Sequence, residues 1–517
     1  MLRCSLLFSA MDLTRRQTTV LCASILVVAL CGITYELLIG AVSSYLLGNS
    51  VYQFSIIIGL FMFAMGMGSF VSRFIKQENL VRVFVVIEVL VALMGGICSL
   101  TLFLTFSTVP NVYHVVMYGF VILIGAMVGI EIPILTRILA TQKDIKDALS
   151  DVFSLDYIGA LIGSLIFPLL LLPHLGLIRS SFAIGLFNIS VAILNAWVFR
   201  SYFARPRRVM VVTALLFVAL ILAITFGSFL TKFAGQKLYM FDVIHREQSL
   251  YQRVILTKSA VNGEHRLYID GHIQFAERDE HRYHEALVHP LMSQEGEVKS
   301  VLILGGGDGM CAREVFKWEG VESIDLVDID PEITRICSEL PQIVKLNEGA
   351  LTDERLTLHH TDAFQYVRDT EKRYDRIIVD LPDPHNEVLN KLYSREFYFL
   401  LRQILTPGGG MVSQCSSPLM TRQVYWCIGK SMEAGGWKLQ SYHAQIPSFG
   451  VWGFHLAFPE EAPVNLEKDY PKNLRYLTKE VFEASQVFPN DIARVETPVN
   501  SMLEPLLYHI YNNELRR

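Results

Sequence analysis

Two acidic peptides in the second half of the chain carry the residue types best suited to chemistry. The first is the glycine turn at residues 305–309, which contains Asp308, and the second is residues 378–384, which contain Asp380 and Asp383. A glycine-rich turn between a strand and a helix normally offers backbone N–H groups to an anionic phosphate. Here a carboxylate lies inside the turn, and two more follow a later strand. The pattern predicts a pocket for a cation.

The elements expected around these peptides place several acidic residues at one edge of a sheet. Beyond residue 240 the sequence alternates short strand and helix patterns, which is typical of an α/β domain. In such a domain the ligand lies across the carboxyl ends of the parallel strands. Strands are expected at residues 300–304, 323–327, 356–359, 376–379 and 410–414. The first four are followed or ended, in order, by the glycine turn, Asp328, Asp362 and Asp380.

Asp328 is predicted to bind a ribose. It lies a little beyond ~20 residues after the turn, where an acidic side chain can accept hydrogen bonds from both ribose hydroxyls. Asp328 could instead cap the helix that starts near Pro331, but Asp330 is closer and can take that role. Met310 stands where a dinucleotide fingerprint requires glycine, so the turn alone is a weak signal.

The first 231 residues are far more apolar than the rest of the chain. The 517-residue sequence is 52% hydrophobic, its mean hydropathy is +0.36, and seven stretches can each span ~30 Å of hydrocarbon. We expect an all-α polytopic membrane bundle over residues 1–235. Carboxylates at Glu36, Glu131 and Asp156 are costly there, so they should either bind a cation or hold helices together. The seven spans lie near residues 18–47, 52–72, 83–107, 112–136, 152–175, 180–199 and 209–231.

The charged half divides into three expected segments. Residues 240–281 form a small antiparallel β-unit with turns at Asn262-Gly263 and Asp270-Gly271. A helix near 282–293 opens a Rossmann-like domain of the S-adenosylmethionine-methyltransferase type over residues 282–460, and residues 461–517 are a C-terminal extension. Eight scattered cysteines suggest neither a zinc site nor a disulfide framework, and the net charge of −5 gives no nucleic-acid footprint.

Roughly residues 249–458 resemble the polyamine aminopropyltransferases, commonly called spermidine synthases. The apolar half is similar to that of the multi-pass bacterial members of this family. Each motif is weak alone, but together they are highly specific. They are Leu250-Tyr251-Gln252, Asp270-Gly271-His272-Ile273-Gln274, Glu277-Arg278-Asp279-Glu280, Tyr283-His284-Glu285, residues 305–309, Asp328, and Asp380 to Pro384.

The resemblance implies transfer of an aminopropyl group from decarboxylated S-adenosylmethionine to a diamine. Putrescine is the expected acceptor, with spermidine and methylthioadenosine as products. Asp380 would accept the proton, and the polyamine would be bound by Tyr283, His284, Asp308 and Asp383. An amine nucleophile needs a free lone pair, and carboxylates can bind the cation and take its proton, so we expect no metal and no bound cofactor. The residues implied to contact the donor are Gln252, Gly305, Gly307, Asp328, Asp362 and Ala363.

Two departures from the family pattern leave the acceptor open. The loop after Pro384 begins with His385 instead of the usual Gly-Pro-containing segment, and Phe449 lacks an aromatic hydroxyl often found at its position. Two other functions also remain open. A methyltransferase would share the sheet, but the carboxylates disfavour a donor that keeps its own carboxylate. A polyamine transporter or sensor would use the intramembrane carboxylates to line a cation route.

Charge distribution and substrate supply predict opposite orientations. Lys and Arg cluster at residues 15–16, 73–82, 137–146 and 200–208, so the amino terminus should be cytoplasmic. Seven crossings would then place the synthase-like domain outside, although its donor is made in the cytosol. We favour a catalytic domain on the cytoplasmic face of the cell (inner) membrane, with a broken or re-entrant segment in one of the two long spans that carry Glu36 and Glu131. A homo-oligomer is compatible with the sequence.

Overall fold

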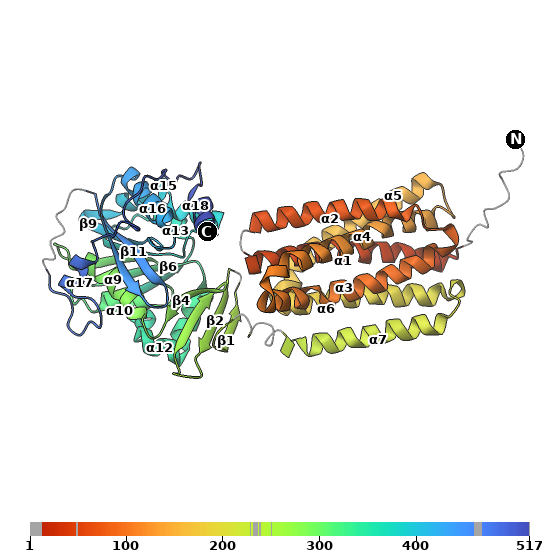
Figure 1. The fold of residues 1–517 in the computed structure, drawn as a ribbon, viewed down its shortest axis with the longest axis horizontal. Helices are drawn as coiled ribbons and strands as arrows, with labels where there is room; N and C mark the ends of the chain where they lie inside the picture. Colours follow the sequence, from red (N-terminus) through yellow and green to blue (C-terminus); the bar gives the residue numbers. More distant parts are fainter. Residues whose placement is uncertain are drawn as a thin grey trace, which may run out of the picture. The chain divides into compact units, whose positions relative to one another are not determined.

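The computed structural model describes residues 13–515 except 48–49, 228, 231–235, 237–238, 250 and 460–467. Leu250, in the first of the sequence motifs, therefore lies outside the described residues. The chain divides into two compact units, Met1–Met240 and Phe241–Arg517 (Figure 1). Each unit has its own hydrophobic core.

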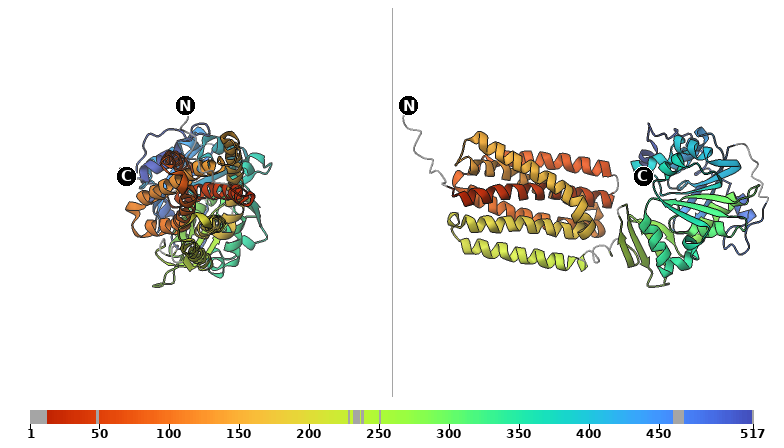
Figure 2. Two further views of the ribbon diagram at one scale, coloured as in Figure 1. Left: turned by 90° about the vertical axis from the view of Figure 1, so that its right-hand side faces the viewer. Right: turned by 180° about the vertical axis from the view of Figure 1, so that it is seen from behind.

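The first unit is a bundle of long helices that lie alongside one another (Figure 1 and Figure 2). Helix α2 packs on α4, α1 on α5, and α3 on α6. A β-carbon at Gly159 would lie 2.3 Å from the carbonyl oxygen of Leu26, so small residues do allow close helix packing here. The helices are α1 (Arg15–Leu47), α2 (Ser50–Ser72), α3 (Leu80–Thr108), α4 (Tyr113–Leu139), α5 (Ile145–Ile166), the π-helical turn η3 (Phe167–Leu171), α6 (Leu172–Val198) and α7 (Pro206–Thr225).

Six helical stretches of the described residues are long and apolar enough to cross a membrane, one fewer than expected. The difference arises because residues 152–175 and 180–199 fall in one stretch, Ile145–Val198. A straight helix of 54 residues would be about 81 Å long, far more than the hydrocarbon thickness. The stretch bends at Gly176, whose φ of 69° and ψ of 178° are not helical. The Ser180 hydroxyl donates to the Leu171 carbonyl at 3.1 Å, so the chain turns sharply there.

The second unit begins with a four-stranded antiparallel sheet in the order β1-β2-β3-β4. In the turn between the last two strands, Asp270 has a φ of 48° and Gly271 a φ of 85°. Positive φ at both positions is what an Asp-Gly hairpin turn requires, so the predicted β-unit is present. The strands are β1 (Asp242–Gln248), β2 (Arg253–Lys258), β3 (His265–Ile269) and β4 (His272–Ala276).

A seven-stranded sheet with the order β10-β11-β9-β8-β5-β6-β7 forms the centre of the second unit. All five expected strands are present. Each is parallel to the strands beside it among these five. Two further strands, which the sequence did not predict, pair antiparallel at one edge. The strands are β5 (Ser300–Gly305), β6 (Ser323–Asp328), β7 (Leu356–His360), β8 (Tyr374–Asp380), β9 (Leu405–Gln414), β10 (Lys438–Ile446) and β11 (Gly450–Phe458).

Helices cover both faces of this sheet (Figure 1). Consecutive residues of β5 point to opposite faces: Ile303 enters one core with α9 and α10, and Leu304 enters the other with α15 and α16. The helices are α9 (Glu280–Met292), α10 (Met310–Phe316), α11 (Pro331–Glu339), α12 (Pro341–Asn347), α13 (Ala363–Asp369), α14 (Glu387–Asn390), α15 (Arg395–Gln403), α16 (Arg422–Ala434), α17 (Lys479–Ala484) and α18 (Leu507–Leu515).

Candidate active site

The strand order reverses between β5 and β8, and the glycine turn and Asp380 meet at this point. Gly305 is paired with Asp380 across the two strands, and the Gly306 N–H donates to the Asp380 carbonyl at 3.2 Å. Gly305 has a φ of 80°, and a β-carbon there would lie 2.1 Å from the same carbonyl oxygen. Glycine is therefore required for the turn to lie against the end of β8, at the place where α/β proteins bind ligands.

Both carboxylate oxygens of Asp380 accept hydrogen bonds from neighbouring helices. The Tyr283 hydroxyl of α9 donates to Oδ1 at 2.6 Å, and the Cys311 thiol of α10 donates to Oδ2 at 3.2 Å. Burial, followed by the charge of Asp380, raises the pKa of both Tyr283 and Cys311 well above their ordinary values. The two donors therefore remain protonated, and they fix the orientation of the carboxylate.

A buried chain of charges holds His284 beside this carboxylate. Arg313 binds both Glu280 oxygens, at 3.1 and 2.9 Å, and Glu280 Oε2 lies 2.9 Å from His284 Nδ1. Burial acts to raise the pKa of Glu280, but His284 and Arg313 lower it to about 2. Burial acts to lower the pKa of His284, yet the hydrogen bond to Glu280 and the charge of Asp308 raise it overall. The ring is thus biased towards its charged form.

Asp308 lies inside the glycine turn, as expected, and it interacts electrostatically with His284 and Asp380. Its Oδ1 accepts the Met310 N–H at 2.9 Å. Burial raises the pKa of the Asp308 carboxyl, His284 opposes that effect, and Asp380 reinforces it. The structure therefore brings Tyr283, His284, Asp308 and Asp380 to one place.

Asp328 contacts the backbone of the glycine turn at Gly307. Its Oδ2 accepts the Gly307 N–H at 3.2 Å and its Oδ1 accepts the Asp330 N–H at 2.9 Å. Burial raises the pKa of Asp328 to about 6. Asp330 caps α11 by accepting the Glu332 N–H at 3.1 Å, so the interpretation that Asp330 rather than Asp328 is the helix cap is confirmed. A β-carbon at Gly307 would lie 2.5 Å from Asp328 Oδ2.

The remaining expected donor contacts lie on separate elements. Asp362 caps α13 by accepting the Gln365 N–H at 3.1 Å, and its Oδ2 pairs with Lys391 at 2.7 Å. Ala363 is buried at the start of that helix. Gln252 lies in the turn between β1 and β2, where its N–H donates to Ser249 Oγ at 2.9 Å. The donor-binding roles of Gln252, Asp362 and Ala363 stay predictions.

Asp383 forms a second acidic position after β8. Its Oδ2 accepts hydrogen bonds from Ser416 Oγ at 3.1 Å and from the Tyr511 hydroxyl of α18 at 3.1 Å. Its Oδ1 is buried and has no hydrogen-bond donor among the residues that the structure describes. Burial raises the pKa of Asp383 to about 6 against the opposing effect of its donors. An unpaired buried acceptor of this kind is suited to an incoming ammonium group.

An aromatic wall adjoins Tyr283. Its ring centroid lies 6.0 Å from Phe449, 6.5 Å from Trp452 and 5.5 Å from Phe454. Phe449, which lacks the hydroxyl often found at its position, therefore contributes an aromatic ring beside Tyr283. The Trp452 indole N–H is buried and has no acceptor in the described part of the chain. Such rings attract cations through their faces.

The loop that departs from the family pattern packs against the β-unit. His385 stacks on His272 of β4 with ring centroids 5.0 Å apart, and its Nδ1 lies 2.9 Å from the Asp383 carbonyl oxygen. Burial, followed by the charge of His272, lowers the pKa of His385 to about 4. His385 is therefore neutral at physiological pH and adds no charge next to Asp383.

One trio of described residues could hold a metal ion by geometry. His284, Cys311 and Asp380 each offer one donor atom, and these atoms lie within 4.8 Å of one another. A thiol must lose its proton to ligate a metal, but burial raises the pKa of Cys311. The trio is chemically better suited to hydrogen bonding with an amine.

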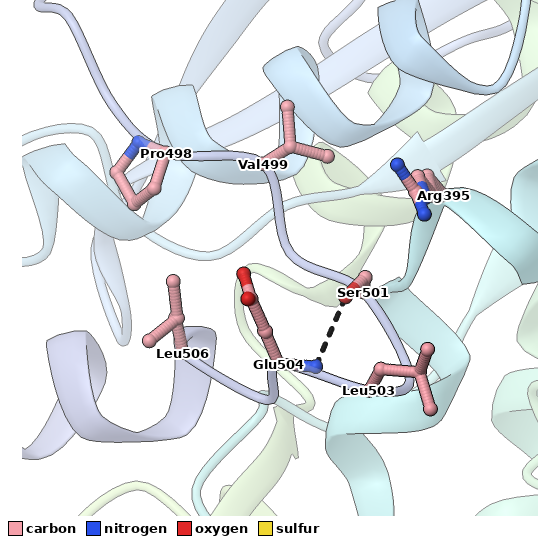
Figure 3. A pocket seen from close by; sticks show the side chains of 7 residues that line it. All are labelled: Arg395, Pro498, Val499, Ser501, Leu503, Glu504 and Leu506. Carbon is pink, nitrogen blue, oxygen red and sulfur yellow. Dashed lines mark hydrogen bonds between the residues drawn. The ribbon is translucent and has the colours of Figure 1, made fainter.

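A surface hollow of about 380 Å³ lies where the C-terminal segment passes the start of α15 (Figure 3). The Glu504 N–H donates to Ser501 Oγ across it at 3.0 Å. None of the predicted site residues lines it. Its lining residues are Arg395, Pro498, Val499, Ser501, Leu503, Glu504 and Leu506.

Sequence reasoning missed four groups that contact the expected site residues. Cys311 was dismissed with the other single cysteines, although its place in the first turn of a helix after the glycine turn was a usable signal. Trp452 lies three residues after Phe449, close to a motif already noted. Ser416 and Tyr511 carry no local signal, because only the folded chain brings them to Asp383.

Comparison with known proteins extends over both units. Residues 280–468 match the family described as the spermine/spermidine synthase domain. The chain is 39% identical to a polyamine aminopropyltransferase of Leptospira interrogans over 96% of this chain and 99% of that one. It is also 39% identical to a polyamine aminopropyltransferase of Oceanobacillus iheyensis, over 97% and 98%. A solved spermidine synthase from Thermotoga maritima is 26% identical, covering 48% of this chain and 85% of its own, with a TM-score of 0.44.

Proposed function

This chain belongs to the polyamine aminopropyltransferases, and from that premise we propose that it moves the aminopropyl group of decarboxylated S-adenosylmethionine to putrescine. Spermidine and methylthioadenosine are the products of that reaction. The observation that carries the proposal is the environment of Asp380, a carboxylate at the end of β8 that two protonated donors orient. The side chains proposed to bind the cation come from three segments of the chain. These segments are α9, the glycine turn and the residues after β8.

In this proposal the acceptor diamine lies between two acidic groups. Asp308 and the unpaired Oδ1 of Asp383 bind ammonium groups, because each belongs to a half-buried carboxylate with acceptor capacity left for a cation. Tyr283 and His284 line the reacting end, and the aromatic wall contacts the methylene chain and the cationic ends. His284 is biased towards its charged form, so it limits the number of positive charges that the pocket accepts.

The bond-making step needs the acceptor nitrogen in its neutral form. Its lone pair attacks the aminopropyl carbon attached to the sulfonium, a C–N bond forms, and the C–S bond breaks with its electron pair left on sulfur. Asp380 takes one proton from the reacting ammonium group of the acceptor before the attack, which frees the lone pair, and the product leaves as a secondary ammonium ion. Alignment of the nitrogen with the C–S bond supplies a further part of the rate acceleration.

The donor is held in our proposal by the groups at the carboxyl ends of β5, β6 and β7. Asp328 accepts from the ribose hydroxyls, and the glycine turn allows the donor to approach the backbone closely. The reaction uses no metal and no resident cofactor in this scheme. The proposed donor contacts are Gln252, Gly305, Gly307, Asp328, Asp362 and Ala363.

The test is a product assay with purified full-length protein, decarboxylated S-adenosylmethionine and a panel of putrescine, cadaverine, agmatine and spermidine, read by mass. Asp380→Asn should abolish turnover while donor binding persists, because the amide keeps the shape but cannot take a proton. Asp369→Asn changes an exposed carboxylate and is the matched control.

Near-normal turnover by Asp380→Asn would remove this residue from the role of base. Product from another amine but not from putrescine would overturn the acceptor assignment and leave the reaction class intact. A methylated product formed from S-adenosylmethionine would instead support a methyltransferase.

We further propose that residues 1–235 lie in the cell (inner) membrane and that the catalytic domain, residues 282–460 with its β-unit at 240–281 and the C-terminal extension at 461–517, faces the cytosol. The six candidate spans support membrane insertion by length and composition. Supply of the donor from the cytosol supports the cytoplasmic face. A broken or re-entrant segment was expected in one of the spans that carry Glu36 and Glu131, but α1 and α4 are continuous helices, and the sharp turn at Gly176 lies between two other expected spans.

A further inference from the structure

Two buried carboxyl groups meet inside the helical unit. Glu88 comes from α3 and Glu131 from α4, and their exposed fractions are 0% and 1%. The two side chains are within hydrogen-bonding reach of each other. Helices α1, α3 and α4, which pack against one another, surround the pair. Glu131 was expected to matter, whereas Glu88 escaped notice in the third apolar span.

None of the four carboxyl oxygens receives a hydrogen bond from an N–H or O–H donor among the described residues. Two carboxylates in contact within an apolar interior would repel each other strongly and lose their hydration. A hydrogen bond between two carboxyl groups needs a proton on one of them. The contact is therefore consistent with one proton for two carboxyl groups, as in other buried acid pairs.

A third helix supplies a polar group to the same place. The Tyr35 side chain of α1 is fully buried, its hydroxyl has no partner in the described part of the chain, and it interacts electrostatically with both Glu88 and Glu131. Its ring lies against Gly95 of α3, where a β-carbon would be 2.2 Å from the Tyr35 ring. Tyr35 is thus an unpaired hydroxyl, independent of the acidic pair, that is held beside it.

The other titratable groups near the pair add no positive charge. Cys31 of α1 interacts with both carboxyls, Cys98 of α3 lies near Tyr35, and Asp156 of α5 interacts with Glu131. All of these are neutral or acidic. A cation has to come from outside this set of residues.

We propose that Glu88 and Glu131 form a proton-binding site within the helical unit, in which the two carboxyl groups share one exchangeable proton beside the Tyr35 hydroxyl. Because two carboxyl groups can share a proton without moving apart, the pair and its four unpaired oxygens favour a proton over a larger cation. Loss of the proton leaves two adjacent negative charges in an apolar interior, so release requires entry of water or of another cation. Intramembrane acids arranged in this way belong to proton pathways.

Infrared spectroscopy of the full-length protein in lipid nanodiscs tests the assignment. A protonated carboxylic acid gives a C=O band that a carboxylate lacks, and the band shifts in D₂O. At pH 8 the catalytic-unit acids Asp328 and Asp383 are ionised, because burial raises the pKa of each only to about 6. We expect the parent spectrum minus the Glu88→Gln/Glu131→Gln spectrum to contain one carboxylic acid band. Tyr35→Phe should move that band, because the neighbouring hydroxyl is lost.

Four results decide the outcome. Aminopropyl transfer at the parental rate by the double variant, whose changes lie outside the catalytic unit, confirms that the chain folds. Asp156→Asn, a half-buried acid on the neighbouring helix, should leave the band in place. A difference spectrum without a carboxylic acid band would overturn the proposal. Loss of the band on addition of spermidine at constant pH would also overturn it, because the occupant would then be an organic ammonium ion.

Discussion

Asp383→Asn should make the α/β unit more stable at pH 8 while it weakens binding of the acceptor amine. Burial raises the pKa of Asp383 from its ordinary 3.8 to about 6. The folded chain therefore holds this proton more tightly than the unfolded chain does, and ionisation of Asp383 opposes folding at higher pH. Asparagine carries no charge, and its amide oxygen can still accept hydrogen bonds from Ser416 and Tyr511.

The size and sign of the effect follow from the two pKa values. Below about pH 4 the carboxyl is protonated in both states, so its titration contributes nothing to the difference. Between about pH 4 and 6 only the unfolded state ionises, and the stability of the parent chain falls by about 1.4 kcal/mol per pH unit. The loss reaches about 3 kcal/mol and then stays constant. The advantage of Asp383→Asn should therefore grow from near zero at pH 4 to about 3 kcal/mol at pH 8.

The measurement is denaturant unfolding of the detergent-solubilised full chain at several pH values, monitored by tryptophan fluorescence. Asp328 titrates in the same range, but its contribution cancels when variant and parent are compared at each pH. Asp369→Asn, at an exposed ion pair, should show no such growth. A difference between Asp383→Asn and the parent that is independent of pH, or a less stable variant at pH 8, would refute the reasoning.

Three further changes probe other parts of the molecule. Asp308→Ala should narrow the preference for decarboxylated donor over S-adenosylmethionine by at least ~1 kcal/mol in calorimetry, because a charge-assisted hydrogen bond is lost; an unchanged preference would exclude that contact. Glu280→Gln should destabilise the unit by about 1.5–3 kcal/mol, because Arg313 loses one of its two buried carboxylate partners and keeps only Glu314, whereas Glu332→Gln, from an exposed pair, should cost less than about 1 kcal/mol; equal unfolding midpoints for these two would contradict the burial argument. A cysteine introduced at Glu295 should react with a membrane-impermeant maleimide only after cells are lysed, with labelling measured above that of the parent chain. Efficient labelling in intact cells would place the catalytic domain outside.

Local patterning was enough to predict most of the large sheet. The five expected strands begin and end within a few residues of β5 to β9, because alternation of strand and helix is visible in the sequence itself. Strands β10 and β11 were not predicted, because β11 follows β10 with no helix between them and both pair antiparallel at the edge. The bend at Gly176 lies in the short connection, residues 176–179, that the sequence places between two expected spans, although hydropathy does not predict its backbone angles.

The candidate site was predictable where topology alone places a residue. Asp308, Asp328 and Asp380 follow parallel strands, and parallel strands bring their carboxyl ends to one edge. The hydrogen-bond partners of these acids could not be predicted from topology. Cys311 reaches Asp380 from 69 residues away and Tyr511 reaches Asp383 from 128 residues away. No periodicity links such positions, so only the folded structure identifies them.

The hydrogen bond between Tyr511 and Asp383 cannot form until Tyr511 has been synthesised, well after Asp383. Ribosomes add about 5–20 residues per second, so the 128 residues that separate the two positions take roughly 6 to 26 s to make. During that interval the nascent chain already contains Asp380, Asp308 and the glycine turn, while Asp383 lacks one of its two hydroxyl donors. The acidic pocket is therefore completed only after Tyr511 has been made, later than the apolar helices, which precede it in the chain.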